Sequence, residues 1–458
     1  MFDGLENRIS AIVAMGGLIA GGVLCPAEGL AVETSLVPGA DSDSISRSQA
    51  SEWYGADDAE TAANGVWSSN ERPGWNGTGV PNEQGAVAYF SSTKKNNVTQ
   101  DNSDGVTIGS LILDLGNTKT GENFDLIVKG TSDKVFGPIA FDQDGTGPGS
   151  AVISNNAAHY RIQIGKTAPI TLKDDLLLIN TTDDSSVRTF SISITAKIGG
   201  AGNVTFDNQL DSPDNGPILL SNADSDFSGS VLIRRGCAKA QNAKAFGLTT
   251  NSVTLGAEGY GDATLCFEGS AMTFAYPLTV GKVTNGRLRI HGETISNDPK
   301  KNCTVTMTGT IALDGDCVFD IPAKPHADTE WTYLHTIKAP ISGAGALIKE
   351  NDGTLVIQKV NTANSYAGGT VLKEGTISVK SGATLGTGAL DVYDGATLDL
   401  ESDVTVQSLS VNGKLQPKGT YAAADSEEPG VIKVAWLTGS GKLTAVEGKE
   451  SGLILLVR

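Results

Sequence analysis

Short segments of this chain alternate between apolar and polar residues. In the stretch TISV, Ile377 and Val379 fall on one side of the alternation and the hydroxyl residues fall on the other. TLDL, from Thr397 to Leu400, repeats the pattern. Successive side chains of a strand point to opposite faces, so a period of two predicts short β-strands with one buried face. No stretch predicts a long helix.

These predicted strands recur at a regular interval. A polar residue precedes glycine at Gly375, Gly395 and Gly413, in steps of 20 and 18 residues, and each step holds two short strands. One such step cannot bury its apolar face alone, but stacked steps build a continuous core. The period therefore predicts an all-β fold, a right-handed parallel β-helix (solenoid) with short strands and Gly-rich turns, in preference to a β-sandwich.

A longer repeat supports this interpretation. Each of three upstream residues, Phe227, Gly229 and Gly236, recurs 139 positions later, at Tyr366, Gly368 and Gly375. Within the later copy, TVL and TISV are predicted as strands, with a corner at Gly368 and Gly369. The two aromatic residues are predicted to close the core at this corner and not to bind a ligand.

The organisation of the chain follows from these patterns. Ile9 to Leu24 has the length of a secretory h-region, which predicts export. The predicted parts are a signal peptide over 1–31, a β-rich region and start of the β-helix over 32–195, a degenerate repeat copy over 196–337, the best repeat copy over 338–416, and C-terminal coils or a cap over 417–458. No stretch after the signal peptide has the length of a membrane span.

The region 341–400 is similar to the autotransporter-associated β-strand repeat, also called the passenger-associated transport repeat. The residues that carry the resemblance are Gly343, Gly345, Leu347, Lys349, Asn364, Tyr366, Gly368, Gly369 and Thr370. The resemblance implies a secreted or surface-exposed right-handed β-helix, adhesin- or stalk-like, in a Gram-negative-type bacterium. The sequence departs from complete autotransporters, because the 58 residues after Leu400 are too few for a C-terminal outer-membrane barrel.

Composition limits the partners. With 34 Lys and Arg against 52 Asp and Glu, the net charge is −18, which repels nucleic acid and anionic membranes. Glycans or surface proteins are the candidate partners, and the oligomeric state and the ligand stay open. Outside the predicted signal peptide, the cysteines are Cys237, Cys266, Cys303 and Cys317; export would permit disulfides, and the sequence leaves free and paired states open.

The sequence holds no signature of catalysis. The four histidines, His159, His291, His326 and His335, and the cysteines fall in no zinc spacing. Adjacent acids on a strand point to opposite faces, and no phosphate loop or nucleophile elbow is present. We therefore expect no enzyme activity, no cofactor and no metal.

The expected function is a non-enzymatic exported surface protein, and the alternatives are a polysaccharide-active lyase or glycosidase and an inert spacer. Residues on adjacent coils could still converge on the outer face.

Overall fold

The computed structural model describes residues 51–54, 63–69, 74–76, 79–90, 96–114, 124–129, 137–143, 150–157, 160–181, 190–209, 216–269, 271–293, 303–322 and 333–449. Residues 45–458 belong to one compact unit. The predicted signal peptide, His159 and His326 lie outside the described residues. The described chain is all-β and holds no α-helix. None of its elements is a helix with the length and apolar content to cross a membrane.

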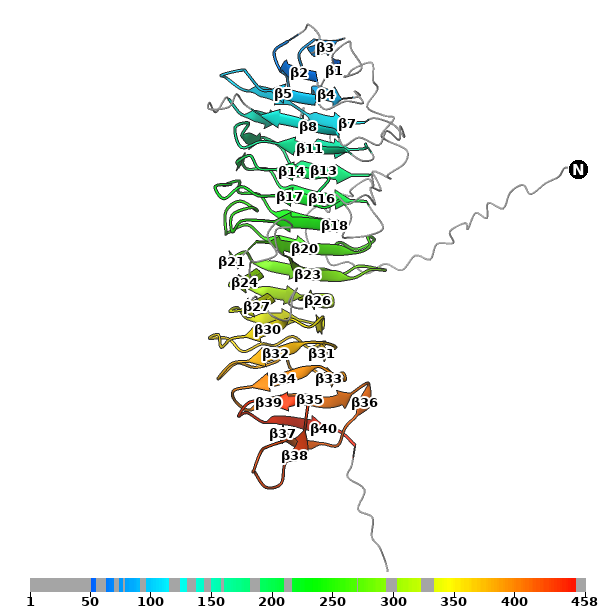
Figure 1. The fold of residues 1–458 in the computed structure, drawn as a ribbon, viewed down its shortest axis with the longest axis vertical. Helices are drawn as coiled ribbons and strands as arrows, with labels where there is room; N and C mark the ends of the chain where they lie inside the picture. The colour runs from blue at the N-terminus through cyan, green and yellow to red at the C-terminus, as the bar shows by residue number, and fades with distance from the viewer. Residues whose placement is uncertain are drawn as a thin grey trace, which may run out of the picture. The chain divides into compact units, whose positions relative to one another are not determined.

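The strands stack as successive rungs of a parallel β-helix (Figure 1). From β4 to β15, and again from β19 to β30, each coil places one strand on each of three faces. The parallel pairing confirms the predicted fold class and contradicts a β-sandwich. Strand alternation explains the result, because each coil turns its apolar positions inward, where the neighbouring coils cover them.

Face A is formed by β1 (Ser51–Tyr54), β3 (Gly74–Asn76), β4 (Val87–Phe90), β7 (Ser110–Leu113), β10 (Ala151–Asn155), β13 (Leu176–Asn180), β16 (Val204–Asn208), the first half of β18 (Val231–Ala240), β19 (Val253–Leu255), β22 (Leu278–Val280), β25 (Ile311–Leu313) and β28 (Ile341–Gly343). Face C is formed by β6 (Val106–Ile108), β9 (Ile139–Phe141), β12 (Ile170–Leu172) and β15 (Ile198–Gly200).

Face B is formed by β2 (Ala63–Val66), β5 (Asn96–Thr99), β8 (Phe124–Lys129), β11 (Tyr160–Ile164), β14 (Ile192–Ile194), β17 (Ile218–Leu220), the second half of β18, β20 (Ala263–Glu268), β23 (Leu288–Glu293), β26 (Cys317–Asp320), β29 (Leu347–Glu350), β31 (Thr370–Leu372), β33 (Leu390–Val392) and β35 (Val404–Val411). Face D is formed by β21 (Ala271–Phe274), β24 (Cys303–Met307), β27 (Tyr333–Ile337), β30 (Thr354–Ile357), β32 (Thr376–Val379), β34 (Thr397–Leu400) and β39 (Leu437–Thr438).

From β31 to β34 each coil has two strands, one on face B and one on face D. The predicted strands TVL and TISV are β31 and β32, and β32 pairs in parallel with β34. Thr370 pairs with Leu390, a step of 20 residues, so the predicted period is the length of one coil here. Earlier coils are longer, and Ile311 pairs with Ile341.

The strand predicted after the last glycine of the period does not continue the stack, although the coil before it keeps the period, with Leu390 paired to Leu409. The predicted strand after Gly413 is β36 (Lys414–Leu415), and it pairs antiparallel with β35 instead of starting a new coil. Asn412 and Gly413 both have positive φ, of 51° and 69°, which is the backbone of a tight hairpin turn. Beyond it, β37 (Gly419–Ala423) pairs antiparallel with β40 (Leu443–Glu447) and parallel with β38 (Ile432–Val434).

The opposite end of the stack carries an aromatic cluster. Strands β1 and β3 pair antiparallel, with Trp53 opposite Trp75. The rings of Trp53 and Trp67 each lie 5.1 Å from the ring of Trp75, and Trp75 Nε1 donates to the Trp67 carbonyl at 2.7 Å. These large side chains bury the first rung, which has no coil before it among the described residues.

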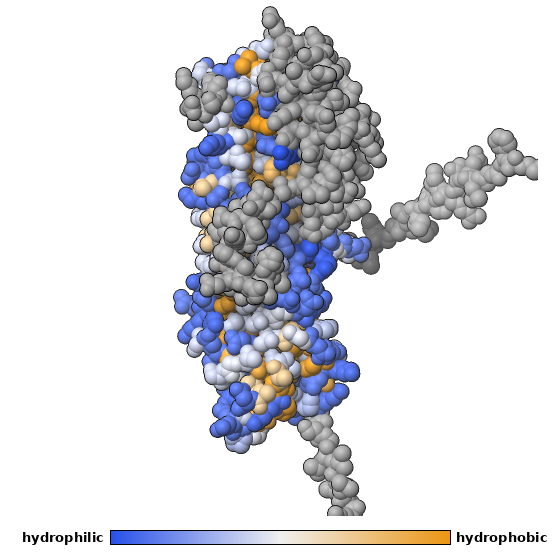
Figure 2. Space-filling model, in the orientation of Figure 1, coloured by the Kyte–Doolittle hydropathy of each residue, from blue (hydrophilic) through white to orange (hydrophobic). Residues whose placement is uncertain are grey.

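One continuous core fills the interior. On face B the register aligns one inward row along consecutive strands, Ile218, Ala238, Leu265, Ile290 and Phe319, and all of these are fully buried. Outward positions are more polar, and Figure 2 shows a largely hydrophilic described surface with smaller hydrophobic areas between. The core fixes which way each strand faces, and it therefore fixes which side chains meet on the outer surface.

Candidate functional site

The repeat-motif residues lie at the corners and in the core of the coils. Leu347, Phe227 and Tyr366 are fully buried, and the Tyr366 hydroxyl lies 2.7 Å from Thr370 Oγ1. Asn364 links three coils, because its Oδ1 accepts from the Ile341 amide at 2.9 Å and its Nδ2 donates to the Thr384 carbonyl at 2.7 Å. These contacts are structural, and none leaves the motif side chains free for chemistry.

The motif glycines allow close contact between coils. A Cβ on Gly345 would lie 2.0 Å from the Gly315 carbonyl oxygen, and a Cβ on Gly368 would lie 2.3 Å from the Gly345 carbonyl carbon. In the upstream copy a Cβ on Gly229 would meet the Gly202 carbonyl oxygen at 2.1 Å. Gly236, Gly343, Gly369 and Gly375 have positive φ. Gly236 lies inside β18, where the strand passes from face A to face B.

A cluster that the sequence interpretation missed lies on the outer side of face B. The register aligns an outward row, Lys239, Cys266, His291, Asp320 and Glu350, along five consecutive strands. The neighbouring outward row begins with Cys237, Thr264 and Arg289. We call these residues, with Glu293 at the end of β23, the face-B cluster. The strands that contribute them are separated in sequence by whole coils, so no local motif reveals the cluster.

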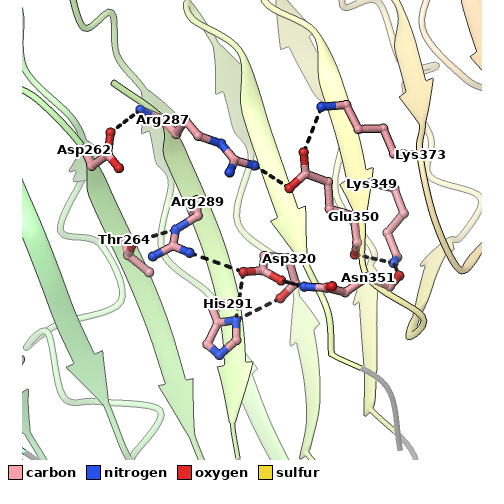
Figure 3. Close-up of polar contacts among 10 residues, drawn as sticks. All are labelled: Asp262, Thr264, Arg287, Arg289, His291, Asp320, Lys349, Glu350, Asn351 and Lys373. Carbon is pink, nitrogen blue, oxygen red and sulfur yellow. Dashed lines mark hydrogen bonds and ion pairs between the residues drawn. The ribbon is translucent and has the colours of Figure 1, made fainter. Parts of the chain in front are cut away.

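Asp320 is the centre of the ionic contacts (Figure 3). Arg289 Nη1 lies 3.5 Å and His291 Nδ1 lies 3.4 Å from Asp320 Oδ2, and Asn351 Nδ2 donates to Oδ1. Burial acts to raise the pKa of Asp320, but His291, Asn351 and Arg289 together lower the pKa to about 2. This carboxylate is therefore ionised and already bonded at neutral pH.

Glu350 ends the row and forms a second set of ion pairs. Its carboxylate binds Arg287 on one side and Lys373, at 3.0 Å, on the other, as Figure 3 shows. Lys349, the adjacent residue, faces inward, and its ammonium donates to the carbonyls of Glu350, at 2.6 Å, and of Asn351. Burial lowers the pKa of Lys349 to about 8.

A pocket of about 100 Å³ opens at the other end of the cluster. Its lining consists of Cys237, Lys239, Thr264, Cys266, Arg289, His291, Glu293 and Asp320. Lys239 forms an ion pair with Glu293, and only 11% of the Lys239 side chain is exposed. Burial acts to lower the pKa of Lys239, but Cys266, Glu293 and Cys237 raise it above its usual value.

The Cys266 thiol of the pocket is not an activated nucleophile. A hydrogen bond with Cys237 and burial raise the pKa of Cys266 well above its usual value, so this sulfur is a thiol at neutral pH. All four described cysteines are free and buried, which answers the disulfide question that the sequence leaves open. The pocket thus combines sulfur, imidazole and carboxylate groups.

Comparison with known proteins finds one relative of interest, "Adhesin BmaC autotransporter" of Brucella suis biovar 1 (strain 1330). It is 34% identical over 118 residues, which is 25% of this chain. The chain spans about 3% of the length of this curated relative. No family model matches the chain. No solved structure matches it.

Proposed function

We propose that this chain is an exported, non-enzymatic surface protein, an adhesin- or stalk-like passenger of a Gram-negative-type bacterium. The main support for the proposal is that 25% of the chain is similar to an autotransporter adhesin. The parallel β-helix fold of the chain agrees with this similarity. Stacked coils give a long surface of outward polar side chains, which suits a protein that presents a binding surface at a distance from the cell.

The proposed location is tested by labelling intact cells of the source bacterium with a membrane-impermeant amine reagent. We expect the protein to be labelled before lysis to the same extent as a known surface protein, while a cytosolic protein stays unlabelled. Labelling that requires lysis would contradict the proposal.

The proposed partners are glycans or surface proteins. Outward Ser, Thr, Asn and Asp side chains can hydrogen-bond sugar hydroxyls, and a net charge of −18 disfavours polyanions. Binding of the purified chain to defined spots on a glycan array, or to the surface of host cells, is the expected result. Absence of binding to both would favour the inert spacer.

The face-B cluster is the specific observation in favour of a second candidate, a polysaccharide-active lyase or glycosidase. Carboxylates and cations converge there, as such chemistry requires. Asp320, however, has a pKa of about 2 and three partners, and Glu293 is paired with Lys239. We therefore expect no new reducing ends or unsaturated products from a panel of acidic and neutral polysaccharides. Product formation that Asp320→Asn abolishes would favour the enzyme.

A further inference from the structure

Four side chains of the face-B cluster have the donor chemistry of a transition-metal site. Ligand atoms of Cys266, His291 and Glu293 all lie within 4.8 Å of one another. The Cys237 side chain is hydrogen-bonded to Cys266 and lines the same pocket. Two sulfurs, one imidazole nitrogen and one carboxylate oxygen form a set of four ligands, the number that Zn²⁺ prefers.

The fold brings these donors together on three adjacent strands. Cys266 of β20 and His291 of β23 are direct register partners, and Glu293 lies two positions beyond His291 on the same face. Cys237 of β18 pairs with Thr264, two positions before Cys266, so its side chain is also outward. Parallel pairing therefore groups donors from neighbouring strands, with Cys266 29 positions after Cys237 and His291 25 positions after Cys266.

The orientation of His291 favours metal binding. Its Nδ1 lies 3.1 Å from the Asp320 main-chain carbonyl oxygen, which can only accept a hydrogen bond. Nδ1 therefore carries a proton, which leaves Nε2 as the ring nitrogen that can bind a metal. Metal-binding histidines are commonly held in this way, through a carbonyl or carboxylate at the second nitrogen. Asp320 supplies both groups, since its carboxylate Oδ2 also lies 3.4 Å from Nδ1.

Lys239 provides a positive charge in this pocket. Its ammonium group binds Glu293, and Lys239 lines the same pocket as both sulfurs. A positive charge is thus already favoured among these donors. A divalent ion would displace the ammonium from Glu293, and the side chain of Lys239 would then oppose metal binding by charge repulsion.

We propose that Cys237, Cys266, His291 and Glu293 bind one divalent transition-metal ion, with Zn²⁺ as the preferred ion. On binding, each thiol loses its proton to solvent and its sulfur bonds to the metal, so two protons are released and no electron is transferred. Zinc–ligand bonds of about 2.0 to 2.3 Å place tetrahedral ligands about 3.3 to 3.8 Å apart, so the ligand atoms of Cys266, His291 and Glu293 close in by about 1 Å. Ca²⁺ and Mg²⁺ do not fit, because they prefer oxygen ligands.

The test is a titration of the full purified chain, freed of metal, with Zn²⁺ against a chromophoric chelator and with Co²⁺ by absorption spectroscopy. We expect one ion per chain, a thiolate-to-Co²⁺ charge-transfer band, no competition by excess Ca²⁺, and release of two protons per Zn²⁺. Proton release is measured on the unmodified chain, so it tests the proposal even where a variant fails to fold.

Three substitutions and one matched control locate the site. Cys266→Ser and Cys237→Ser should each weaken Zn²⁺ binding roughly 100-fold or more and reduce the thiolate band. Lys239→Met should strengthen binding about 10-fold, because the competing charge is removed. Cys317→Ser removes another buried free thiol that faces the core, and it should leave the affinity and the band unchanged.

The proposal is overturned by any of three results: no thiolate band, fewer than two protons released, or equal affinities in the wild type and Cys266→Ser. A band that Cys317→Ser abolishes would also overturn it, because the metal would then lie elsewhere. None of these readouts depends on the proposed surface location or on glycan binding, so failure of one proposal does not imply failure of the other.

Discussion

His335 is a buried histidine that must stay neutral in the folded chain. Its side chain is fully buried on β27, and neither ring nitrogen has a hydrogen-bond partner among the described residues. Its ring lies edge-on to Phe267 at 6.2 Å, and Gly292 leaves room for Nε2, since a Cβ there would lie only 2.5 Å away. Burial, and secondarily the charges of His291 and Lys349, lower the pKa of His335 to about 3.

The low pKa of His335 in the folded chain predicts a loss of stability in acid. Between the unfolded pKa of about 6.5 and the folded pKa of about 3, the unfolded chain binds one more proton, so stability falls as the pH falls. His335→Leu removes the titrating group. When the pH is lowered from 7.5 to 4.5, the free energy of unfolding of the wild type should therefore fall by about 2.7 kcal/mol more than that of His335→Leu. Urea unfolding of both chains at both pH values measures this difference.

The control for His335 is Ile337→Val in the same buried strand. It should cost about 1 kcal/mol equally at both pH values, because it removes one methylene and no titrating group. Parallel pH dependence of His335→Leu and the wild type would contradict the assignment of the acid sensitivity to His335.

At the scale of the element, the corners of the coils use glycine in two distinct ways. Gly345 is required because the coils touch there, and a Cβ would lie 2.0 Å from the Gly315 carbonyl oxygen. Gly395 has a φ of 86°, but apart from its own chain neighbours no described residue lies within 4 Å of the position of its Cβ. The first glycine serves packing between coils, and the second serves the turn itself.

These two roles predict different costs for the same substitution. Gly345→Ala should lower the free energy of unfolding by about 3 kcal/mol or prevent folding, because backbone atoms must move apart. Gly395→Ala should cost only about 1 to 2 kcal/mol, the cost of left-handed backbone for an L-residue. Urea unfolding of both variants measures the difference, and equal costs would show that close contact between coils is not what Gly345 provides.

At the scale of the whole described molecule, each coil contacts mainly the coils before and after it. Strand β16 pairs with β13 and β18, while β32 pairs with β30 and β34. Stability in such a stack is close to a sum of coil terms and nearest-neighbour terms. Damage in one coil should therefore stay local.

Hydrogen exchange measured by mass spectrometry tests this locality. Phe206→Ala removes a fully buried ring from β16, at a cost of about 3 to 5 kcal/mol. Protection should fall in β13, β16 and β18 and stay unchanged in β30, β32 and β34. Leu398→Ala in β34 should give the reverse pattern. A uniform loss of protection over all coils would show instead that the stack unfolds as one unit.

The sequence by itself determined much of the coil. Alternation at Ile377 and Val379 predicted β32, and the spacing of Gly375 and Gly395 predicted the coil length there. These features are local, because a strand's two faces and a turn's backbone are set by neighbouring residues. The same reasoning failed at Gly413, since a polar residue before glycine suits both a coil corner and a hairpin, and only the partner strand decides between them.

Only the tertiary structure determines which residues meet in the face-B cluster. Cys266 and His291 occupy adjacent outward positions because β20 and β23 pair in one register, and a shift of one residue would turn either side chain into the core. Coil lengths vary, with 20 residues at Thr370 and 30 at Ile311 as examples, so sequence spacing does not predict this register. Local pattern sets which residues face outward, and the stacking of the coils sets which of them meet.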